Sequence, residues 1–332
     1  MSVVAKGPSS PDAPAVSVII ATCDRPQFLL DCVASILRND YQDFEIIIVD
    51  QARERTLQAA LDQRFSGENR LVYVVLNEAN LSLARNAGIE HARADIIVFS
   101  DDDVEVEPGW LTAYVAAFDA CGAEPVVVGG RLDPLWFGPR PRWLPERKEY
   151  LLGIYDRHDG LILMPEPDLP IGANFAVHRK VVDAVGGFDA RVGPSYTRKR
   201  GMIFGDDTLF SLRARNARYA VYHQGAARSW HKMLPHKMTK MWFVRRSFWE
   251  GVTLLTVLHL AGSVQASQWH RVVLWHAHEA FRWGRRLAKT LVRWTQAANP
   301  AQDAMEAVSS IAHSAGVIRA ALQLRVTGRL PW

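Results

Sequence analysis

Apolar residues between positions 16 and 130 gather in short runs, and each run is followed by a stretch whose apolar positions recur at helical spacing. The runs are rich in β-branched residues, as is typical of strands that helices cover on both faces. We expect such strands at 16–21, 45–49, 71–76, 96–99 and 125–130. Helices are expected between them, at 26–37, 56–65, 80–92 and 108–120. Because strands that alternate with helices form parallel sheets through right-handed crossovers, the pattern predicts an α/β fold.

The pattern is lost between residues 131 and 170, where proline and aromatic residues predict a long irregular excursion. Regular structure is expected again as strands at 171–177 and 219–222 and as helices at 179–185 and 205–214. Residues 193–201 are polar, basic and bounded by glycines, which predicts a mobile loop. The tripeptide 229–231 is expected to follow the last strand.

Three adjacent carboxylates, Asp101 to Asp103, follow the strand expected at 96–99. Like charges about 4 Å apart repel by about 1 kcal/mol or more, so such clusters usually share a cation or a hydrogen-bonded ligand. Oxygen ligands suit hard cations such as Mg²⁺ or Mn²⁺. A solvated acidic loop is the alternative, but the carboxyl end of a strand is where open α/β sheets bind ligands. The sequence has no glycine-rich motif for a dinucleotide or a P-loop, which argues against those sites.

Residues 232–332 differ in charge from the rest of the chain, because they hold fourteen Lys and Arg against four Asp and Glu. They also hold seven of the eleven tryptophans. Basic helices with aromatic faces are typical of elements that lie on an anionic membrane surface. Helices that pack on the preceding domain or on a second subunit are the alternative. No run reaches the ~18 apolar residues that would span a bilayer.

Residues 1–15 lack an apolar signal core and are rich in Pro and Ser, which predicts a disordered leader. A domain at 16–231 and a helical extension at 232–332 are expected to follow it. The three cysteines form no paired motif, which predicts a reducing compartment and no structural zinc. We therefore expect a cytoplasmic protein whose extension contacts the inner face of the cell membrane.

Six segments, taken in order, resemble the family 2 glycosyltransferases of the GT-A fold. They are VSVIIATCDRP, EIIIVD, LARNAGIEHARADIIVFSDDD, GANFAVHRKVVDAVGGFD, GDDTLFSLRAR and SWH, and they cover about residues 16–231. The resemblance implies a Rossmann-like mixed, mostly parallel sheet flanked by helices, here with a C-terminal helical extension. It also implies an inverting enzyme that moves a sugar from a nucleoside diphosphate sugar to a saccharide or lipid-linked acceptor, with Mg²⁺ or Mn²⁺.

The resemblance implies a role for each acid. Asp103 is expected to bind the metal together with His231, while Asp101 and Asp102 face the ribose or the sugar. An acid pair opens a helix in this family, and here it is Asp206-Asp207. We expect Asp207 to be the general base that deprotonates the acceptor and Asp206 to orient the acceptor.

Further residues match donor-binding positions of the family: Thr22, Arg25, Asp50, Arg85, Gly172 and Asn174. Asp50 corresponds to an acid that hydrogen-bonds the nucleobase. The sequence departs from the family pattern just after it, where residues 51–53 read Gln-Ala-Arg instead of a second acid or Asn, then Gly or Asn, and then Ser. The identity of the base is therefore left open.

Two alternatives are kept beside this interpretation. A nucleotidyltransferase of related fold would usually carry a glycine-rich basic loop after the first strand, and the sequence TCDRP there is not one. A protein that has lost catalysis and binds a sugar nucleotide or a membrane is the other alternative. No nucleic-acid-binding motif accompanies the basic extension, so we expect no nucleic acid partner.

Overall fold

The computed structural model describes residues 13–52, 56–156, 158–194, 203–265 and 268–330. The chain divides into two compact units. The first, here called the sheet unit, comprises residues 1–133, 156–190 and 210–231. The second, the helical unit, comprises residues 134–155, 191–209 and 232–332. The segments 134–155 and 191–209 thus join the C-terminal helices, although they lie before residue 231 in the sequence.

Nine strands form one mixed sheet in the order β3-β2-β1-β4-β8-β6-β9-β5, with β7 paired to β9. Its first four strands are parallel, whereas β8 runs antiparallel to β4. The strands are β1 (Val16–Thr22), β2 (Phe44–Asp50), β3 (Leu71–Val75), β4 (Ile96–Asp101), β5 (Val104–Val106), β6 (Val127–Trp136), β7 (Leu161–Leu163), β8 (Asn174–His178) and β9 (Val221–Met233). The predicted α/β fold with a mixed sheet is confirmed.

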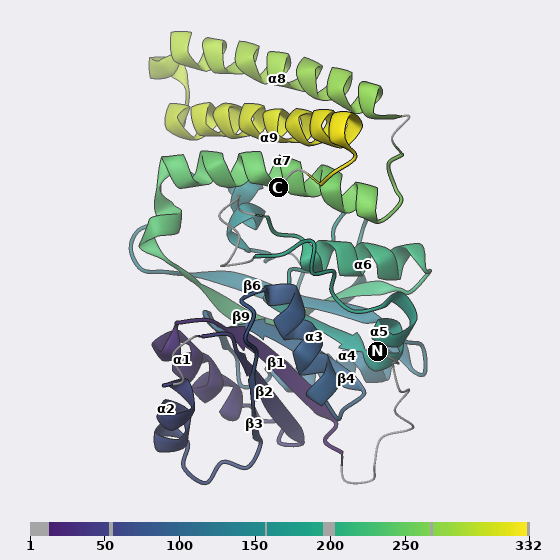
Figure 1. The fold of residues 1–332 in the computed structure, drawn as a ribbon. Coiled ribbons are helices and arrows are strands. Elements are labelled where there is room, and N and C mark those ends of the chain that lie inside the picture. The colour runs from purple at the N-terminus through teal and green to yellow at the C-terminus, as the bar shows by residue number, and fades with distance from the viewer. Residues whose placement is uncertain (1–12, 53–55, 157, 195–202, 266–267, 331–332) are drawn as a thin grey trace. The chain divides into compact units, whose positions relative to one another are not determined.

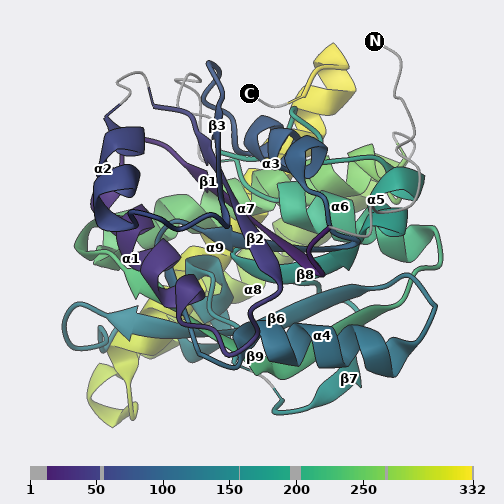
Figure 2. The same ribbon diagram turned by 90° about the horizontal axis from the view of Figure 1, so that it is seen from below.

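Helices cover both faces of the parallel strands. The helices on the parallel strands are α1 (Pro26–Leu37), α2 (Leu57–Arg64) and α3 (Leu81–His91). They are followed along the chain by α4 (Trp110–Cys121), α5 (Arg179–Val185) and α6 (Asp206–Asn216). Alternate side chains of β1 point to opposite faces, so Val18 and Ile20 pack with α1 while Ile19 faces α3. Gly88 permits this approach, because a Cβ there would overlap the Ile19 side chain. Figure 2 shows α1 and α2 on one side of β1 and β2 and α3 on the other.

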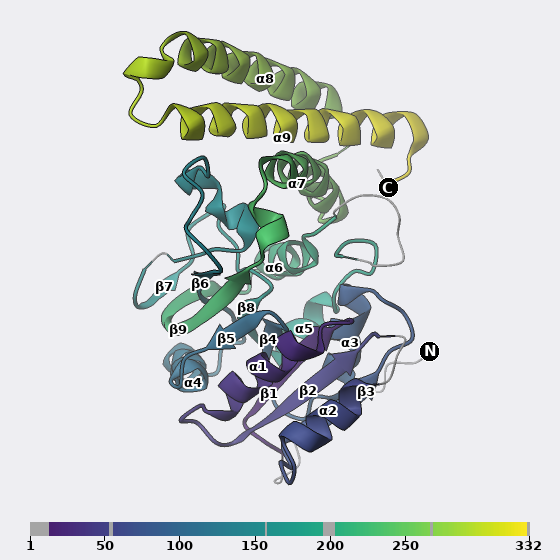
Figure 3. The same ribbon diagram turned by 90° about the vertical axis from the view of Figure 1, so that its left-hand side faces the viewer.

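Three long helices dominate the helical unit: α7 (Lys240–Leu260), α8 (Trp269–Val292) and α9 (Pro300–Thr327). Short 3-10 turns, η1 (Glu146–Leu152), η2 (Pro235–Met238) and η4 (Trp294–Gln296), accompany them. Figures 1 and 3 show α9 between α7 and α8. Where α7 crosses α9, two glycines let the backbones meet. A Cβ on Gly251 would overlap the carbonyl oxygen of His313, and a Cβ on Gly316 would overlap that of Phe248. No helix within the described residues is long and apolar enough to cross a membrane.

Two sequence-based predictions were wrong in detail. The last strand extends from Val221 to Met233, so residues 229–231 lie inside β9 and do not follow it. Its polar positions, which include Arg228 and Lys232, had concealed the strand pattern. The excursion expected at 131–170 also holds regular structure, namely the end of β6, η1 and β7. Most of the leader (1–12) and of the predicted mobile loop (195–201) lies outside the described residues.

Candidate active site

The carboxyl ends of β2, β1 and β4 bring the predicted donor-binding residues to one edge of the sheet unit. Thr22 at the end of β1 pairs with Asp50 at the end of β2, and Ala21 pairs with Asp101 at the end of β4. These strands are parallel, so all three end at the same edge. In open α/β sheets this edge is where ligands bind.

Asp102 is the buried centre of the acid cluster. Its Oδ2 accepts a hydrogen bond of 2.8 Å from the Thr22 hydroxyl, and its Oδ1 lies 3.1 Å from Nη2 of Arg25. Burial raises the pKa of Asp102 to about 7, although the positive charge of Arg25 opposes that rise. The side chain has no exposed surface and contacts Thr22 and Arg25, and its predicted contact with the ribose or the sugar stays a prediction.

Asp103 and His231 lie side by side. Strand β5 runs antiparallel to β9, with Val104 opposite His231, and this register places Asp103 Oδ1 3.4 Å from Nε2 of His231. The other oxygen of Asp103 accepts a hydrogen bond of 3.0 Å from Nη1 of Arg25. Arg25 therefore bridges Asp102 and Asp103, a role that its position in the sequence did not reveal.

This pair of side chains fits a divalent cation. A carboxylate oxygen and an imidazole nitrogen are a donor set that Mn²⁺ accepts. Within the described residues no group of three or more His, Cys, Asp or Glu side chains is arranged as a metal site. A cation held by Asp103 and His231 would therefore need further ligands from a substrate and from water, as Mg²⁺ and similar ions commonly take.

Asp101 is the most exposed of the three acids, with about a third of its side chain (32%) accessible, against 0% for Asp102 and 4% for Asp103. Its Oδ1 is paired with Nη2 of Arg85 at 3.1 Å. The same nitrogen of Arg85, which reaches in from α3, donates to the carbonyl of Gly172 at 2.8 Å. Arg85 is buried, so it ties the end of β4 to the segment before β8 and leaves one face of Asp101 open.

Asp50 is fully buried, and both carboxylate oxygens have protein partners. Oδ1 accepts from the backbone N–H of Ala52 at 2.8 Å, and Oδ2 accepts from the Tyr73 hydroxyl. The side-chain oxygen Oε1 of the next residue, Gln51, accepts a hydrogen bond of 2.7 Å from the backbone N–H of Asn80. Asn80 in turn caps the start of α3. Gln51, the residue at which the sequence departs from the family pattern, thus holds the start of α3, the helix that carries Arg85. The sequence marked Gln51 as unusual, but nothing in it revealed Tyr73.

Asn174 is enclosed at the start of β8, with every hydrogen-bonding position of its amide taken. Its oxygen accepts from Trp110 Nε1 at 2.8 Å and from the Tyr114 hydroxyl at 2.7 Å. Its nitrogen donates to the carbonyls of Arg131 at 2.7 Å and Ala227 at 2.9 Å. The predicted contact to the donor would require Asn174 to exchange one of these partners.

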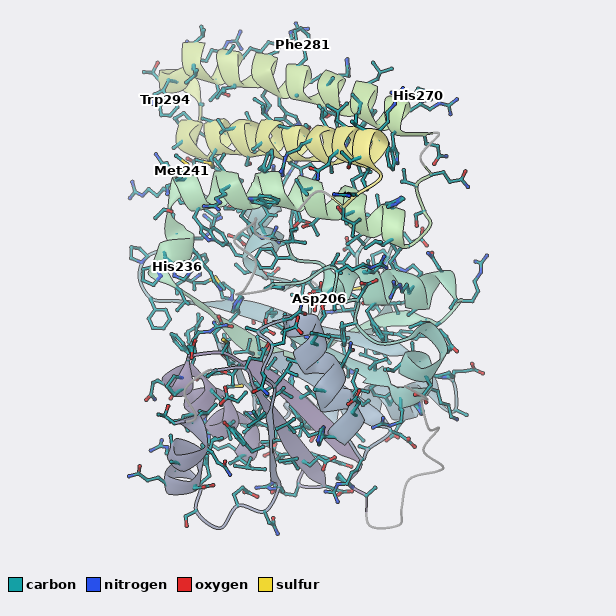
Figure 4. All side chains as sticks on the ribbon, viewed as in Figure 1. Asp206, His236, Met241, His270, Phe281 and Trp294 are labelled. Atoms are coloured by element: carbon teal, nitrogen blue, oxygen red, sulfur yellow. The ribbon has the colours of Figure 1, made fainter. Side chains whose placement is uncertain are left out.

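Asp206 and Asp207 lie in the first turn of α6 and belong to the helical unit. Figure 4 labels Asp206. Asp206 is buried, whereas Asp207 is partly exposed. Oδ1 of Asp207 accepts from the backbone N–H of Thr208 at 2.7 Å. A helix N-terminus favours both side chains as anions. The acid cluster and His231, in contrast, belong to the sheet unit.

A mixed sheet with an acid cluster at the carboxyl edge of its parallel strands is the architecture of a GT-A glycosyltransferase, and this chain is an enzyme of that class. It belongs to glycosyl transferase family 2, whose profile matches residues 17–186. The resemblance drawn from the sequence motifs is thereby confirmed.

Two proteins of Haloferax volcanii are similar to the chain in sequence. Glucosyl-dolichyl phosphate glucuronosyltransferase is 26% identical over 238 residues, which cover 71% of this chain and 75% of the relative. Glycosyltransferase AglE is 24% identical over 211 residues, which cover 63% and 64%.

Two solved structures share the fold. The mannosyltransferase PcManGT from Pyrobaculum calidifontis, in complex with GDP-Man and Mn²⁺, aligns over 98% of this chain and 81% of its own, with a TM-score of 0.55 and 18% identity. GalNAc-T7 with UDP, GalNAc and Mn²⁺ aligns over 77% and 52%, with a TM-score of 0.52 and 13% identity. At these identities the likeness is one of fold.

Proposed function

We propose that this glycosyltransferase moves a sugar from a nucleoside diphosphate sugar to a hydroxyl of a saccharide or lipid-linked acceptor, with inversion in a single displacement. The observation that carries the proposal is the Arg25–Asp103–His231 cluster beside a partly open Asp101, at the edge where the fold binds ligands. The similarity to an enzyme named for a glucosyl-dolichyl phosphate acceptor supports a lipid-linked acceptor.

In this proposal Asp103 and His231 hold Mg²⁺ or Mn²⁺. When bound, the cation offsets the negative charge that gathers on the departing diphosphate. Arg25 already holds one oxygen of Asp103, so a cation and Arg25 compete for that carboxylate, while Nη2 of Arg25 can stay on Asp102. The presence of Mn²⁺ in both structural neighbours supports this assignment.

The donor lies against the carboxyl edge of the sheet. Asp101, as the most accessible acid of the cluster, binds a ribose or sugar hydroxyl. Arg85 and the carbonyl of Gly172, which are hydrogen-bonded to each other, lie beside Asp101 in the donor-binding site, and the backbone of Thr22 contacts the nucleotide. The buried side chains of Asp50, Asp102 and Asn174 act through the groups that they hold in place.

Asp207 is the proposed general base. An acceptor hydroxyl must lose its proton as it attacks the anomeric carbon, and a positioned carboxylate accepts that proton. The Thr208 N–H donates to Oδ1 of Asp207 at 2.7 Å and helps to hold the carboxylate in the first turn of α6. The buried Asp206 orients the acceptor.

The helical unit supplies the proposed contact with an anionic membrane surface, at the inner face of the membrane. Large apolar side chains on or just after α8 are exposed: Leu274, Trp275, Phe281, Leu291, Val292 and Trp294. Figure 4 shows Phe281 on the outer side of α8. Five Lys and Arg residues accompany one Glu on this helix, so apolar insertion and attraction to anionic lipid act together.

The test is a product analysis with GDP-mannose, UDP-glucose, UDP-N-acetylgalactosamine and UDP-glucuronate, each with Mn²⁺ and a polyprenyl phosphate-linked glucose as acceptor. Release of nucleoside diphosphate together with a glycosylated acceptor is the expected result. Release of pyrophosphate would favour the nucleotidyltransferase alternative. Donor binding without any turnover would favour a protein that has lost catalysis.

A further inference from the structure

Phe204 and Gly205, which precede the acid pair, lie against one face of α7. Within the helical unit, the backbone N–H of Phe204 donates to the hydroxyl oxygen of Thr253 at 3.4 Å. The guanidinium carbon of Arg246 lies 4.3 Å from the centre of the Phe204 ring. Residues 246 and 253 are two helical turns apart, so they share a face of α7.

The Arg246 side chain is itself held in place. Its Nη1 pairs with Glu250 Oε2 at 2.6 Å, one turn along the same helix. Arg246 and Thr253 are both buried. A planar guanidinium fixed by a carboxylate and stacked on an aromatic ring is a more rigid support than a lysine ammonium would be.

Gly205 turns the chain from this support into α6. Its φ of +92° lies in the left-handed region that favours glycine. A Cβ there would come within 2.7 Å of Cγ2 of Thr253 and 3.2 Å of Cγ2 of Val257. The Gly205 carbonyl accepts the N–H of Leu209 at 2.8 Å, which is the first hydrogen bond of α6. The direction of the first turn therefore follows from where α7 holds residues 204 and 205.

We propose that α7 is the positioning element for the acid pair, with Thr253 and Arg246 as positioning residues that aim the Asp207 carboxylate. The inference rests on the proposed role of Asp207 as base. It gives the C-terminal helices a part in the chemical step that is separate from any membrane contact. A displacement of a catalytic group by about 1 Å can lower a rate by as much as about a hundredfold, so a modest shift of residue 204 suffices.

Matched pairs of variants test this proposal. Thr253→Val removes the acceptor for the Phe204 N–H and keeps the side-chain shape, whereas Thr256→Val removes a buried hydroxyl on α7 that bonds only its own helix, to the Val252 carbonyl at 2.7 Å. Arg246→Lys removes the planar group over Phe204. Arg319→Lys is its control, because it makes the same change at another cation–π contact: the guanidinium carbon of Arg319 lies 5.2 Å from the centre of the Trp249 ring and not over Phe204.

Nucleoside diphosphate release is measured with the most active nucleotide sugar of the panel, alongside the melting temperature. Thr253→Val and Arg246→Lys should lower kcat about fivefold or more while the KM for the donor changes by less than about twofold, because an aligned base acts in the transition state. Thr253→Ser should recover most of the loss. The two control variants should stay within about twofold of the parent enzyme.

The decisive measurement is a double-mutant cycle with Asp207→Asn. If Thr253 acts through Asp207, Thr253→Val should add no further loss to the residual activity of Asp207→Asn. An equal loss in both backgrounds, or equal losses in Thr253→Val and Thr256→Val that follow the melting temperature, would overturn the positioning role. Full turnover by Asp207→Asn would instead remove the proposed base itself, so the two failures can be told apart.

Discussion

The enclosed amide of Asn174 supports a quantitative prediction about the stability of the fold. Asn174→Ala would remove the acceptor of two buried donors, on Trp110 and Tyr114, and one donor from each of two carbonyls, that of Ala227 and that of Arg131, which also accepts from the Ser229 hydroxyl at 3.2 Å. A buried polar group that loses its partner costs about 1–3 kcal/mol, and a water in the small void recovers part of that. We therefore expect the free energy of unfolding to fall by about 4 kcal/mol.

The assay is urea unfolding followed by fluorescence, with Asn39→Ala as the control. Asn39 is equally buried but makes two such bonds, to the Leu111 N–H at 2.9 Å and the Ile36 carbonyl at 3.2 Å, so its loss should be about half as large. A loss below about 1 kcal/mol for Asn174→Ala, together with weaker donor binding, would refute the reasoning. Asn174 would then serve the donor directly and not the framework.

Three further predictions concern the metal, the membrane and pH. Asp103→Asn should abolish the response of nucleoside diphosphate release to added Mn²⁺, while urea unfolding stays close to that of the parent; an unchanged Mn²⁺ response would count against the metal site. Phe281→Ser should lower sedimentation with vesicles that contain anionic lipid, whereas Leu322→Ser, an exposed position on α9, should not; equal effects of the two would argue against α8 as the contact. Burial lowers the pKa of His313 to about 4, an effect that Glu250 opposes and Lys148 reinforces. Between about pH 6.5 and 4 the unfolded chain therefore binds a proton that the folded chain does not. The free energy of unfolding should fall as pH drops through that range. His313→Gln should flatten this dependence in urea titrations at several pH values, and an unchanged slope would exclude His313 as its source.

The sequence was sufficient for the strands of the parallel half because their signal is local. Runs such as 16–21 and 45–49 are mostly apolar, and two residues mark helix starts locally: Pro26 by its fixed φ, and Asn80 by a side-chain oxygen that accepts the Leu83 N–H. Strand β9 was found only in part, since its polar residues pair with strands that are distant in sequence. Its antiparallel register with β5 decides which residue meets Asp103, and no local pattern encodes a register.

In the candidate site, too, the sequence predicted the position of the acids but not the partners of their side chains. Motif order placed the acids of residues 101–103 at a strand end, and the structure agrees. The partners of each acid depend on side chains that converge from separate elements, such as Arg25 from the loop before α1 and Arg85 from α3. The enclosure of Asn174 depends on partners from three elements at once, namely α4, β6 and β9. Contacts of this kind are properties of the assembled sheet, so a sequence pattern can name the participants but not their pairing.

The charge balance of the cluster explains why it suits a cation. Asp101, Asp102 and Asp103 are held by two guanidinium groups, and Arg25 serves two of the three acids. Repulsion among the acids is thus offset without a metal, which lets the site form before the donor arrives. A divalent cation that takes Asp103 from Arg25 breaks the ion pair of Nη1 with Asp103 and keeps that of Nη2 with Asp102. In the proposed complex Nη1 turns to an oxygen of the diphosphate, so the cation that displaced it from Asp103 and Arg25 then share the leaving group's charge.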